Sequence, residues 1–440
     1  MLTGDEYRAS VRDGRTSFLS GERVDNASEH RLLGVSVDWV ARTYDRLQGE
    51  GSSAQSPLFD APTTPAELAS QMELLTASDP TAAITAGCMS LSRVAPALAL
   101  LNPDYAERLG RVLESVRQED HRVAAAHTDL GAFGVVGRTA DGVVVRGAKQ
   151  HVLGAAVVHD LVVVPEGDLL EGQTDAAIAF MIPVNTPGVK IVSVTTAPLS
   201  EDDRHFPISR EYSMADATVL FDDVVVPNER IFLDGETAEA GSLAKTFGLW
   251  ERARGAADQA DRAELLLGLA YTIADMNGLT DVAHIREKLS RLAVYANLCR
   301  AGWESALAHA QPASDGAMVP DESAVYAALA YGTDLYSRMV AIVHDVGGAS
   351  TITAPTVADY ENEATRGYVE KYMSTGNNVR GEDRMKVFHL IRDLTADRYS
   401  GWLKVTNQML GGGVLAQQLA ALDHYPLTHA QDSVRAAAHI

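Results

Sequence analysis

One stretch, residues 124–165, most limits the fold of this chain, because β-branched runs replace a helical pattern there. Its three Val-rich runs lie at residues 133–136, 143–145 and 161–164. Runs of this kind, separated by turn residues, are typical of strands. The pair Asp141-Gly142 between the first two runs suits a two-residue hairpin loop. We therefore predict a β-meander, with His127 in the segment that leads into it.

Strand-like runs continue to about residue 232, and we expect about seven strands between residues 133 and 232. The residues before this region show apolar side chains at helical spacing. The helices expected there lie within residues 37–47, 66–75 and 104–127, the last with Asp104 as its N-cap.

From residue 237 the pattern is helical to the end of the chain. Six apolar residues recur at intervals of four, three, four, three and four, which is the spacing of a helix packed in a bundle: Ile285, Leu289, Leu292, Ala296, Cys299 and Trp303. Other helices are expected over 263–276, ending at Asn277-Gly278, and over 323–343, 384–398 and 399–409. We predict an α+β fold with an N-terminal helical domain (1–127), a middle β-barrel or sandwich domain (128–234) and a C-terminal helical bundle (235–440).

Composition narrows the class of protein. The 440 residues are 46% apolar and 22% charged, which is ordinary for a soluble globular protein. The net charge is −22 and no basic run occurs, so we expect no nucleic-acid partner. The N-terminus is charged and no run of about 18 apolar residues occurs, so we expect no signal peptide and no membrane span. Two cysteines cannot form a disulfide framework, which favours the cytoplasm.

Four segments carry a resemblance to a known family. They are LTGDEYRASVRDGRTSFLSGERVDN (2–26), VVVRGAKQHVLGAAVVHDLVVVP (143–165), AFMIPVNTPGVK (179–190) and FDDVVVPNERIFL (221–233). They resemble the flavin-dependent 4-hydroxyphenylacetate 3-hydroxylase family, which has the acyl-CoA dehydrogenase fold. The similarity extends from Leu2 to the glycines at 411–413, so it is specific as to family and much less so as to substrate.

The resemblance implies a catalytic role for His127. Within AAAHTDL it matches the family's histidine, which contacts the substrate and stabilises the oxygenated flavin. Imidazole suits this role because its unperturbed pKa of about 6.5 lets it donate a hydrogen bond or pass a proton near neutral pH. The alternative is a histidine that only caps the last carbonyls of a helix. The family match favours the catalytic role.

The resemblance also implies cofactor contacts. Thr128 and Asp129 match positions that touch the flavin, although the family's next dozen residues, with an Asn-Pro-Gln segment, are missing before Gly131. Leu153 stands where the family has a threonine that pairs with the flavin ring, so the N–H of Gly154 or Ala155 would have to replace it. The alternative there is a close-packed strand.

A glycine run near the C-terminus matches a family turn that approaches the cofactor. It consists of Gly411, Gly412 and Gly413. Glycines permit backbone approaches that side chains would block. The alternative is a simple helix terminator.

The substrate-binding motif of the family is altered. In TAGCMSLSRVAPA, Leu91 and Ala95 stand where the family has the Arg and Tyr that hold and deprotonate a phenol. Arg93 lies two residues away, which on a helix turns its side chain by about 200° to the other face. The substrate is therefore expected not to be 4-hydroxyphenylacetate. A nonphenolic, bulkier or carrier-bound substrate of a biosynthetic reaction suits this motif better.

The leading hypothesis is the oxygenase component of a two-component monooxygenase that receives reduced FAD from a separate reductase. No GxGxxG motif follows a strand, so the chain should not bind NAD(P)H itself. Following the family, we expect a homotetramer assembled through the C-terminal bundle. The sequence Arg146-Gly147-Ala148-Lys149 is expected to be a strand and not a phosphate site, because no helix N-terminus follows it.

Two alternatives remain open. One is a flavin-dependent dehydratase or dehydrogenase that acts on an acyl thioester, as elsewhere in this fold. A 4-hydroxybutyryl-CoA dehydratase holds an iron–sulfur cluster with three Cys and one His, whereas this chain has only Cys88 and Cys299, with Val294 at the matching His position. We therefore expect no metal centre. The other alternative is a nonenzymatic homologue that has lost the Arg, Tyr and Thr of the family.

Overall fold

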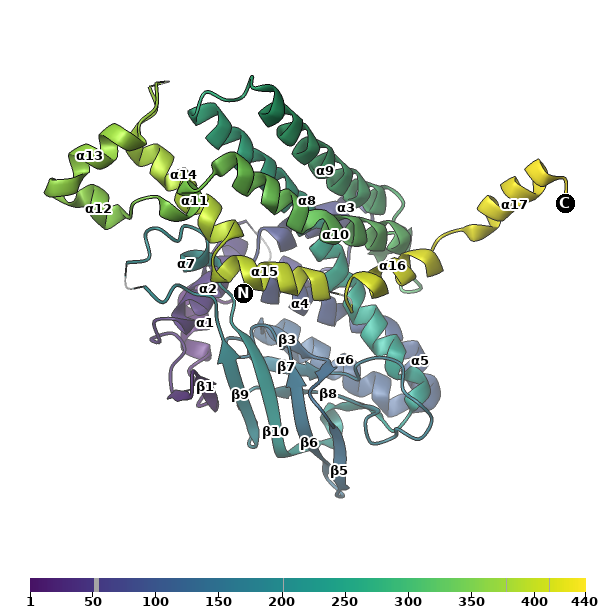
Figure 1. Ribbon diagram of the computed structural model, residues 1–440. Helices are drawn as coiled ribbons and strands as arrows, with labels where there is room; N and C mark the ends of the chain where they lie inside the picture. The colour runs from purple at the N-terminus through teal and green to yellow at the C-terminus, as the bar shows by residue number, and fades with distance from the viewer. Residues whose placement is uncertain (51–54, 201, 377, 411) are drawn as a thin grey trace.

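The computed structural model describes residues 1–50, 55–200, 202–376, 378–410 and 412–440. In Figure 1 a bundle of long helices lies above a layer of strands; the first N-terminal helix lies at the left of the strands, and later ones lie partly behind them. The bundle helices are α8 (Ala240–Met276), α9 (Ala283–Ala308), α10 (Glu322–Gly347), α14 (Gly381–Thr395) and α15 (Arg398–Met409).

The N-terminal helices are α1 (Gly4–Ser10), α2 (Leu33–Glu50), α3 (Pro65–Thr76), α4 (Pro80–Met89), α5 (Ala95–Leu101) and α6 (Pro103–Glu119). Three of them, α3, α4 and α6, begin with a polar cap and with a proline in the first turn. The Asn102 side chain accepts a hydrogen bond from the N–H of Asp104 and is the N-cap of α6. The prediction that Asp104 is the N-cap is therefore wrong. The predicted extension of this helix to residue 127 is also wrong. It ends at Glu119, because Asp120 adopts a left-handed conformation with φ of 53°.

The strands form two main sheets. The seven-stranded sheet has the order β2 (Glu22–Val24), β1 (Ser17–Leu19), β9 (Val189–Val194), β10 (Asp216–Pro227), β6 (Gly142–Gln150), β4 (Thr128–Asp129), with β5 (Gly134–Arg138) also paired to β6. The four-stranded sheet has the order β11 (Ile231–Asp234), β8 (Ile178–Pro183), β7 (Asp160–Val163), β3 (Val123–Ala126). In the described part of residues 133–232 the strands are β5 to β11, which confirms the predicted number of about seven.

The predicted meander is only partly correct. β5 and β6 form the expected hairpin, with Arg138 opposite Val143, but β7 pairs with β3 and β8 in the other sheet. The role predicted for Gly142 is also different. This residue has no positive φ, and a Cβ at Gly142 would lie 2.1 Å from the carbonyl oxygen of Val226. A close approach of β10, and not the hairpin turn, therefore requires glycine there.

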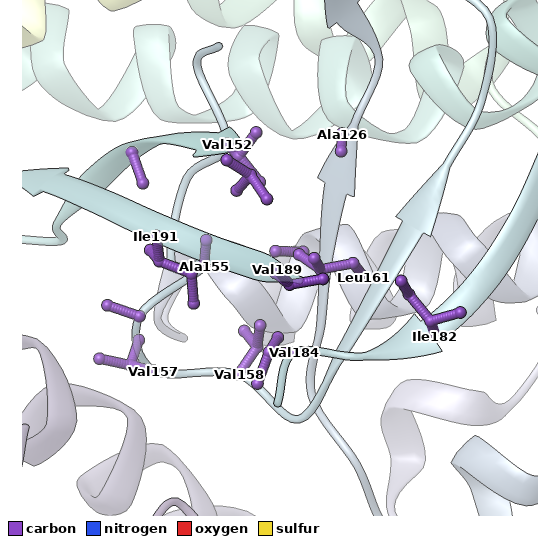
Figure 2. Packing of buried hydrophobic residues seen from close by; sticks show 14 of the residues in the cluster. Ala126, Val152, Ala155, Val157, Val158, Leu161, Ile182, Val184, Val189 and Ile191 are labelled. Carbon is purple, nitrogen blue, oxygen red and sulfur yellow. The ribbon is translucent and has the colours of Figure 1, made fainter. Parts of the chain in front are cut away.

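The four-stranded sheet is buried on both faces, which explains its nearly continuous apolar runs. Along β3, Ala124 and Ala126 face a cluster shared with the seven-stranded sheet, while Val123 and Ala125 face a cluster shared with α6. Figure 2 shows the first cluster, with Ala126 at its upper margin. Alternate residues of a strand point to opposite faces, so every residue of β3 is buried.

The bundle confirms the predicted C-terminal helices. Five residues of the apolar seam of α9 pack in one core with α8, α10, α14 and α15, whereas Trp303 belongs to a second core with α3, α4, α8 and α10. The end predicted for α8 is correct, since Gly278 follows with φ of 64°, but the helix begins at Ala240, well before the predicted residue 263. The remaining helices are α7 (Ser209–Tyr212), α11 (Ser350–Thr353), α12 (Val357–Glu361), α13 (Glu363–Met373), α16 (Val414–Asp423) and α17 (Leu427–Ala438).

The predicted N-terminal and middle domains are not separate in the structure, because strands of the N-terminal part belong to the sheets of the middle part. β1 and β3 come from the N-terminal part and hydrogen-bond into the sheets, so the boundary proposed at residue 127 directly follows a sheet strand. The three domain ranges therefore stay a prediction. Residues 80–101 form one helical stretch that is long and apolar enough to cross a membrane by length and composition. Half of it is buried, and residues 80–88 of α4 lie entirely inside the fold, as in a core helix.

Candidate active site

His127 lies where the chain crosses from one sheet to the other. Ala126 before it pairs with Val163 in the four-stranded sheet, and Thr128 after it pairs with Gln150 in the seven-stranded sheet. The backbone on both sides of His127 is thus fixed by strand pairing. No helix ends here, because α6 stops at Glu119, so the helix-capping alternative is wrong.

The His127 side chain is neutral at neutral pH. Burial lowers its pKa to about 4, and the positive charges of Lys149 and Arg252 act in the same direction. Its Nδ1 is buried without a hydrogen-bond partner among the residues that the structure describes. An imidazole in this state can accept a proton or donate a hydrogen bond to a bound molecule.

Lys149 fixes the crossing on which His127 lies. Its side chain is 1% exposed, and its Nζ lies 2.5 Å from Asp129 Oδ1. Nζ also donates to the carbonyl oxygens of Val164 at 3.1 Å and His127 at 3.2 Å. These partners occupy the three donors of the ammonium group. Asp129, predicted to contact the cofactor, therefore neutralises Lys149, and the predicted strand at residues 146–149 is confirmed as part of β6.

The turn after β6 uses most of its own N–H groups. The Gly154 N–H donates to Ala215 O at 2.8 Å, and the Ala155 N–H donates to Val152 O at 3.3 Å. Both N–H groups are thus hydrogen-bonded within the fold, and their contact with the cofactor stays a prediction. The strand alternative is wrong, because residues 153–157 form a turn. Within the described residues, only the Leu153 N–H of these three lacks an acceptor.

The residues predicted to bind the substrate lie in two different places. Leu91 is fully buried in the core shared by α4, α5 and α6, and Ala95 packs against the same core. Arg93 points elsewhere. Its guanidinium lies 5.3 Å from the centre of the Trp250 ring, and its Nε is 3.7 Å from Asp315 Oδ2. The described residues show no contact between Arg93 and His127.

The glycine run separates α15 from α16. Gly412 and Gly413 have φ of 92° and 91°, which favours glycine, and Gly411 lies outside the described residues. Leu410 just before them packs against α8 so closely that a Cβ at Gly255 would lie 2.2 Å from its Cδ2. These glycines act as helix terminators, and their contact with the cofactor stays a prediction.

Two residues of α8, Glu251 and Arg252, belong to the candidate site around His127 but were not predicted from the sequence. Arg252 acts electrostatically on His127, and its guanidinium lies 5.4 Å from the centre of the Tyr326 ring on α10. Burial raises the pKa of Glu251 to about 7, which keeps part of this carboxyl protonated at neutral pH. No local motif marks either residue, since both lie inside an uninterrupted helix.

Two cavities of the structure do not include His127. One of about 200 Å³ is lined by Arg111, Val112, Ser115, Glu229 and Arg230, and a second of about 70 Å³ adjoins it beside His121. Pockets for cofactor-sized ligands have volumes of about 300–1,000 Å³, so neither cavity suits one. The unpartnered groups around His127 therefore remain the candidate site.

Two family models together match almost the whole chain. Residues 3–233 match the model described as 4-hydroxyphenylacetate 3-hydroxylase N terminal, and residues 240–439 match its C-terminal counterpart. The chain belongs to the 4-hydroxyphenylacetate 3-hydroxylase family. This confirms the resemblance drawn from the four sequence segments.

Curated relatives differ in their reactions. The oxygenase component of 4-hydroxyphenylacetate 3-monooxygenase from Geobacillus sp. (strain PA-9) is 26% identical, covering 90% of this chain and 88% of the relative. A Streptomyces globisporus monooxygenase of (3S)-3-amino-3-(3-chloro-4-hydroxyphenyl)propanoyl-[peptidyl-carrier protein SgcC2] is 25% identical, covering 91% and 83%. The 4-hydroxybutyryl-CoA dehydratase/vinylacetyl-CoA-Delta-isomerase of Clostridium aminobutyricum is 22% identical, covering 90% of each chain.

A solved structure establishes the fold. The oxygenase component of 4-hydroxyphenylacetate 3-monooxygenase complexed with FAD superposes with a TM-score of 0.90. It is 22% identical, and the match covers 99% of this chain and 98% of that chain. The predicted α+β fold of the acyl-CoA dehydrogenase type is therefore confirmed as a mixed fold of helices and sheets. The division into three domains is a finer prediction that this match leaves open.

Proposed function

We propose that this protein is the oxygenase component of a two-component monooxygenase that works in the cytoplasm with a separate flavin reductase. The observation that carries the proposal is the neutral, half-buried His127, whose Nδ1 is buried without a partner and whose backbone is fixed between two sheets. Two relatives of the chain, one named as an oxygenase component and one named as a monooxygenase, support the reaction class. Reduced FAD, when bound, would supply the electrons with which O₂ is activated.

Three groups of the chain are proposed to contact the flavin ring. A flavin ring carries both acceptors and a donor, and the chain offers the Leu153 N–H, the Arg252 guanidinium and the His127 ring. Thr128 lies beside His127, and Gly412 and Gly413 could approach a cofactor closely. Asp129 would act indirectly, by neutralising Lys149 and so holding the His127 backbone in place.

In this proposal His127 holds or passes a proton at its unpartnered Nδ1. The side chain is neutral above about pH 4, so it can accept a proton from the substrate or donate a hydrogen bond to oxygen. Ala126, the preceding residue, is fully buried in an apolar core, and the His127 Nδ1 is itself buried, so water is excluded from this atom. Exclusion of water strengthens electrostatic interactions and limits wasteful release of hydrogen peroxide.

The substrate is proposed to be an organic molecule other than 4-hydroxyphenylacetate. Leu91 and Ala95 offer no charge or hydroxyl to bind a phenol, and Arg93 is already engaged by Trp250 and Asp315. The Streptomyces globisporus relative is named for a carrier-bound substrate, which supports a bulky, carrier-bound substrate here as well.

The test is reconstitution with a flavin reductase. Protein, reductase, NADH, FAD and O₂ are mixed with free or carrier-bound aromatic substrates, and mass spectrometry detects a product that has gained one oxygen atom. We expect product only when the reductase is present. If the purified protein alone oxidised NADH, the two-component assignment would be wrong.

A second candidate function is a flavin-dependent dehydratase or dehydrogenase acting on an acyl thioester. It needs a carboxylate that can exchange a proton near neutral pH, and Glu251 has a pKa raised to about 7 by burial. The Clostridium aminobutyricum relative supports this reaction class. Cys88 and Cys299 lie in different core clusters, so they do not form part of one metal site. Turnover of an acyl thioester without O₂ would favour this function, whereas a monooxygenase requires O₂.

A further inference from the structure

The positive charges around His127 are not equally neutralised. Lys149 has Asp129 at 2.5 Å and two carbonyl oxygens as partners. For Arg252, by contrast, no carboxylate lies within 4.0 Å among the described residues, and its Nε is buried without a hydrogen-bond partner. Arg252 is therefore the cation in this region that lacks a neutralising anion.

Two neighbours hold the Arg252 guanidinium in one place. A Cβ at Gly248, one turn earlier on α8, would lie 2.9 Å from the guanidinium carbon and both of its terminal nitrogens. The guanidinium therefore folds back over the helix at a point that only glycine leaves open. The ring of Tyr326 on α10 lies 5.4 Å away and contributes a cation–π contact.

The acidic groups nearby do not satisfy Arg252. Glu251 is its neighbour on α8, but burial raises the pKa of this carboxyl to about 7, so it is only partly charged at neutral pH. Glu322 on α10 faces Tyr326, but its carboxylate pairs with His424 at 3.1 Å. Arg252 is half-buried and hydrogen-bonds with Tyr326, but its Nε is buried without a partner and no anion neutralises its charge, which is unfavourable even in a chain whose net charge is −22. A bound anion would remove this penalty.

We propose that Arg252 binds a planar anion beside His127. A guanidinium presents its donors as a fork that matches two acceptors in one plane. Resting on the proposed function, two sources fit this chemistry. One is the N1–C2=O edge of the reduced flavin, which carries negative charge. The other is a carboxylate of the organic substrate.

The experiment compares Arg252→Met with a matched control on the same helix, Arg254→Met. Arg254 is also mostly buried, but it pairs with Asp258 at 3.2 Å. Two ratios are measured in each variant. The first is the ratio of dissociation constants for oxidised and reduced FAD, obtained by anaerobic titration. The second is the ratio for phenylacetate and its uncharged analogue phenylacetamide, measured with FAD present.

If the anion is the reduced flavin, Arg252→Met should weaken the binding of reduced FAD by roughly 10- to 100-fold more than the binding of oxidised FAD. This is the loss expected for a charge-assisted hydrogen bond. A substrate carboxylate predicts that the preference for phenylacetate over phenylacetamide is lost instead. In either case Arg254→Met should change neither ratio. If both ratios in Arg252→Met equal those of the wild-type protein, or if Arg254→Met changes them as much, the proposal is wrong.

Two further variants separate binding from folding. Arg252→Lys keeps the charge but not the fork, so it should recover only part of the lost binding. Gly248→Ala displaces the guanidinium while keeping Arg252, so it should reproduce the loss in Arg252→Met. If the wild-type protein bound no FAD, the proposed function would be wrong. The comparison of phenylacetate with phenylacetamide, made without FAD, would then still test whether Arg252 binds an anion. If Gly248→Ala bound both ligands as well as the wild-type protein does, the proposed position of Arg252 would be wrong.

Discussion

His127 and Lys149 are neighbours, and they differ in whether a nearby group stabilises their charged form. Burial lowers the pKa of Lys149, but the Asp129 carboxylate opposes this shift by stabilising the charged ammonium group, and two carbonyl oxygens accept its other hydrogen bonds. His127 has no such partner, so burial makes its neutral form the stable one. A group that folding leaves neutral and unpartnered is available for a bound molecule. This contrast is the residue-level reason for placing the chemistry at His127.

The first prediction is that His127→Ala uncouples the reaction. Its Nδ1 has no protein partner in the described residues, so its removal breaks no hydrogen bond there, and folding and binding of reduced FAD should persist. Product formed per reduced FAD should fall by roughly 10²–10⁴-fold, the usual effect of removing a general acid–base group, with hydrogen peroxide released instead. Peroxide and product are measured together. Normal coupling in the folded variant would remove His127 from the site.

The second prediction concerns acid stability. Burial lowers the pKa of His127 to about 4, that of His389 to about 4 and that of His159 further. An unfolded histidine titrates near pH 6.5, so between about pH 6.5 and 4 the unfolded chain binds more protons, and the free energy of unfolding falls as the pH falls. His121 acts in the opposite direction, since Asp160 and Glu119 outweigh its burial and raise its pKa.

Urea unfolding at several values between about pH 7 and pH 5 checks this prediction. The His127→Ala variant should lose stability less steeply than the wild-type protein, by up to about 1.4 kcal/mol per pH unit, because one of the contributing histidines is gone. Carboxylates contribute equally to both proteins and cancel in the comparison. Parallel curves would show that His127 is not held neutral in the folded protein.

At the scale of single elements, periodic patterns predicted the bundle helices well and failed at β3. The run of alanines before His127 favours helix by intrinsic propensity. Parallel pairing with β7 and burial on both faces override that preference, and neither can be read from the local sequence. The same limit explains why Arg252 was missed. Its partner Tyr326 lies on another helix, and nothing in the sequence of α8 shows that the charge is unpaired.

The turn after β6 gives a prediction at this scale. Gly154 has φ of 78°, and a Cβ there would lie 2.4 Å from Thr81 Cγ2 on α4. Gly154→Ala should therefore destabilise the protein by about 1–3 kcal/mol, through backbone strain and overpacking. Gly172→Ala is the control, because nothing lies within 4 Å of a Cβ at that position. Equal unfolding free energies for the two variants would contradict this packing.

At the scale of the whole molecule, the bundle and the β layer leave several apolar side chains uncovered. On the outer faces of α8 and α9, Tyr271, Val294 and Leu298 are about half exposed. The chain also ends in α17, which projects away from the rest of the molecule in Figure 1 and buries none of its residues. Apolar faces of this kind are typical of surfaces that pack against another copy of the chain.

The last prediction is a homotetramer that depends on this C-terminal arm. Leu427 and Val434 lie seven residues apart on one face of α17, so that face can pack against a second copy. Light scattering at micromolar concentration should give a mass about four times that of one chain. A chain ending at Tyr425 should form smaller species with an unchanged circular dichroism spectrum per residue, apart from the lost helix, because α17 contributes no buried residue to its own chain. A monomeric full-length protein, or a shortened protein that keeps the tetramer mass, would contradict this role for the arm.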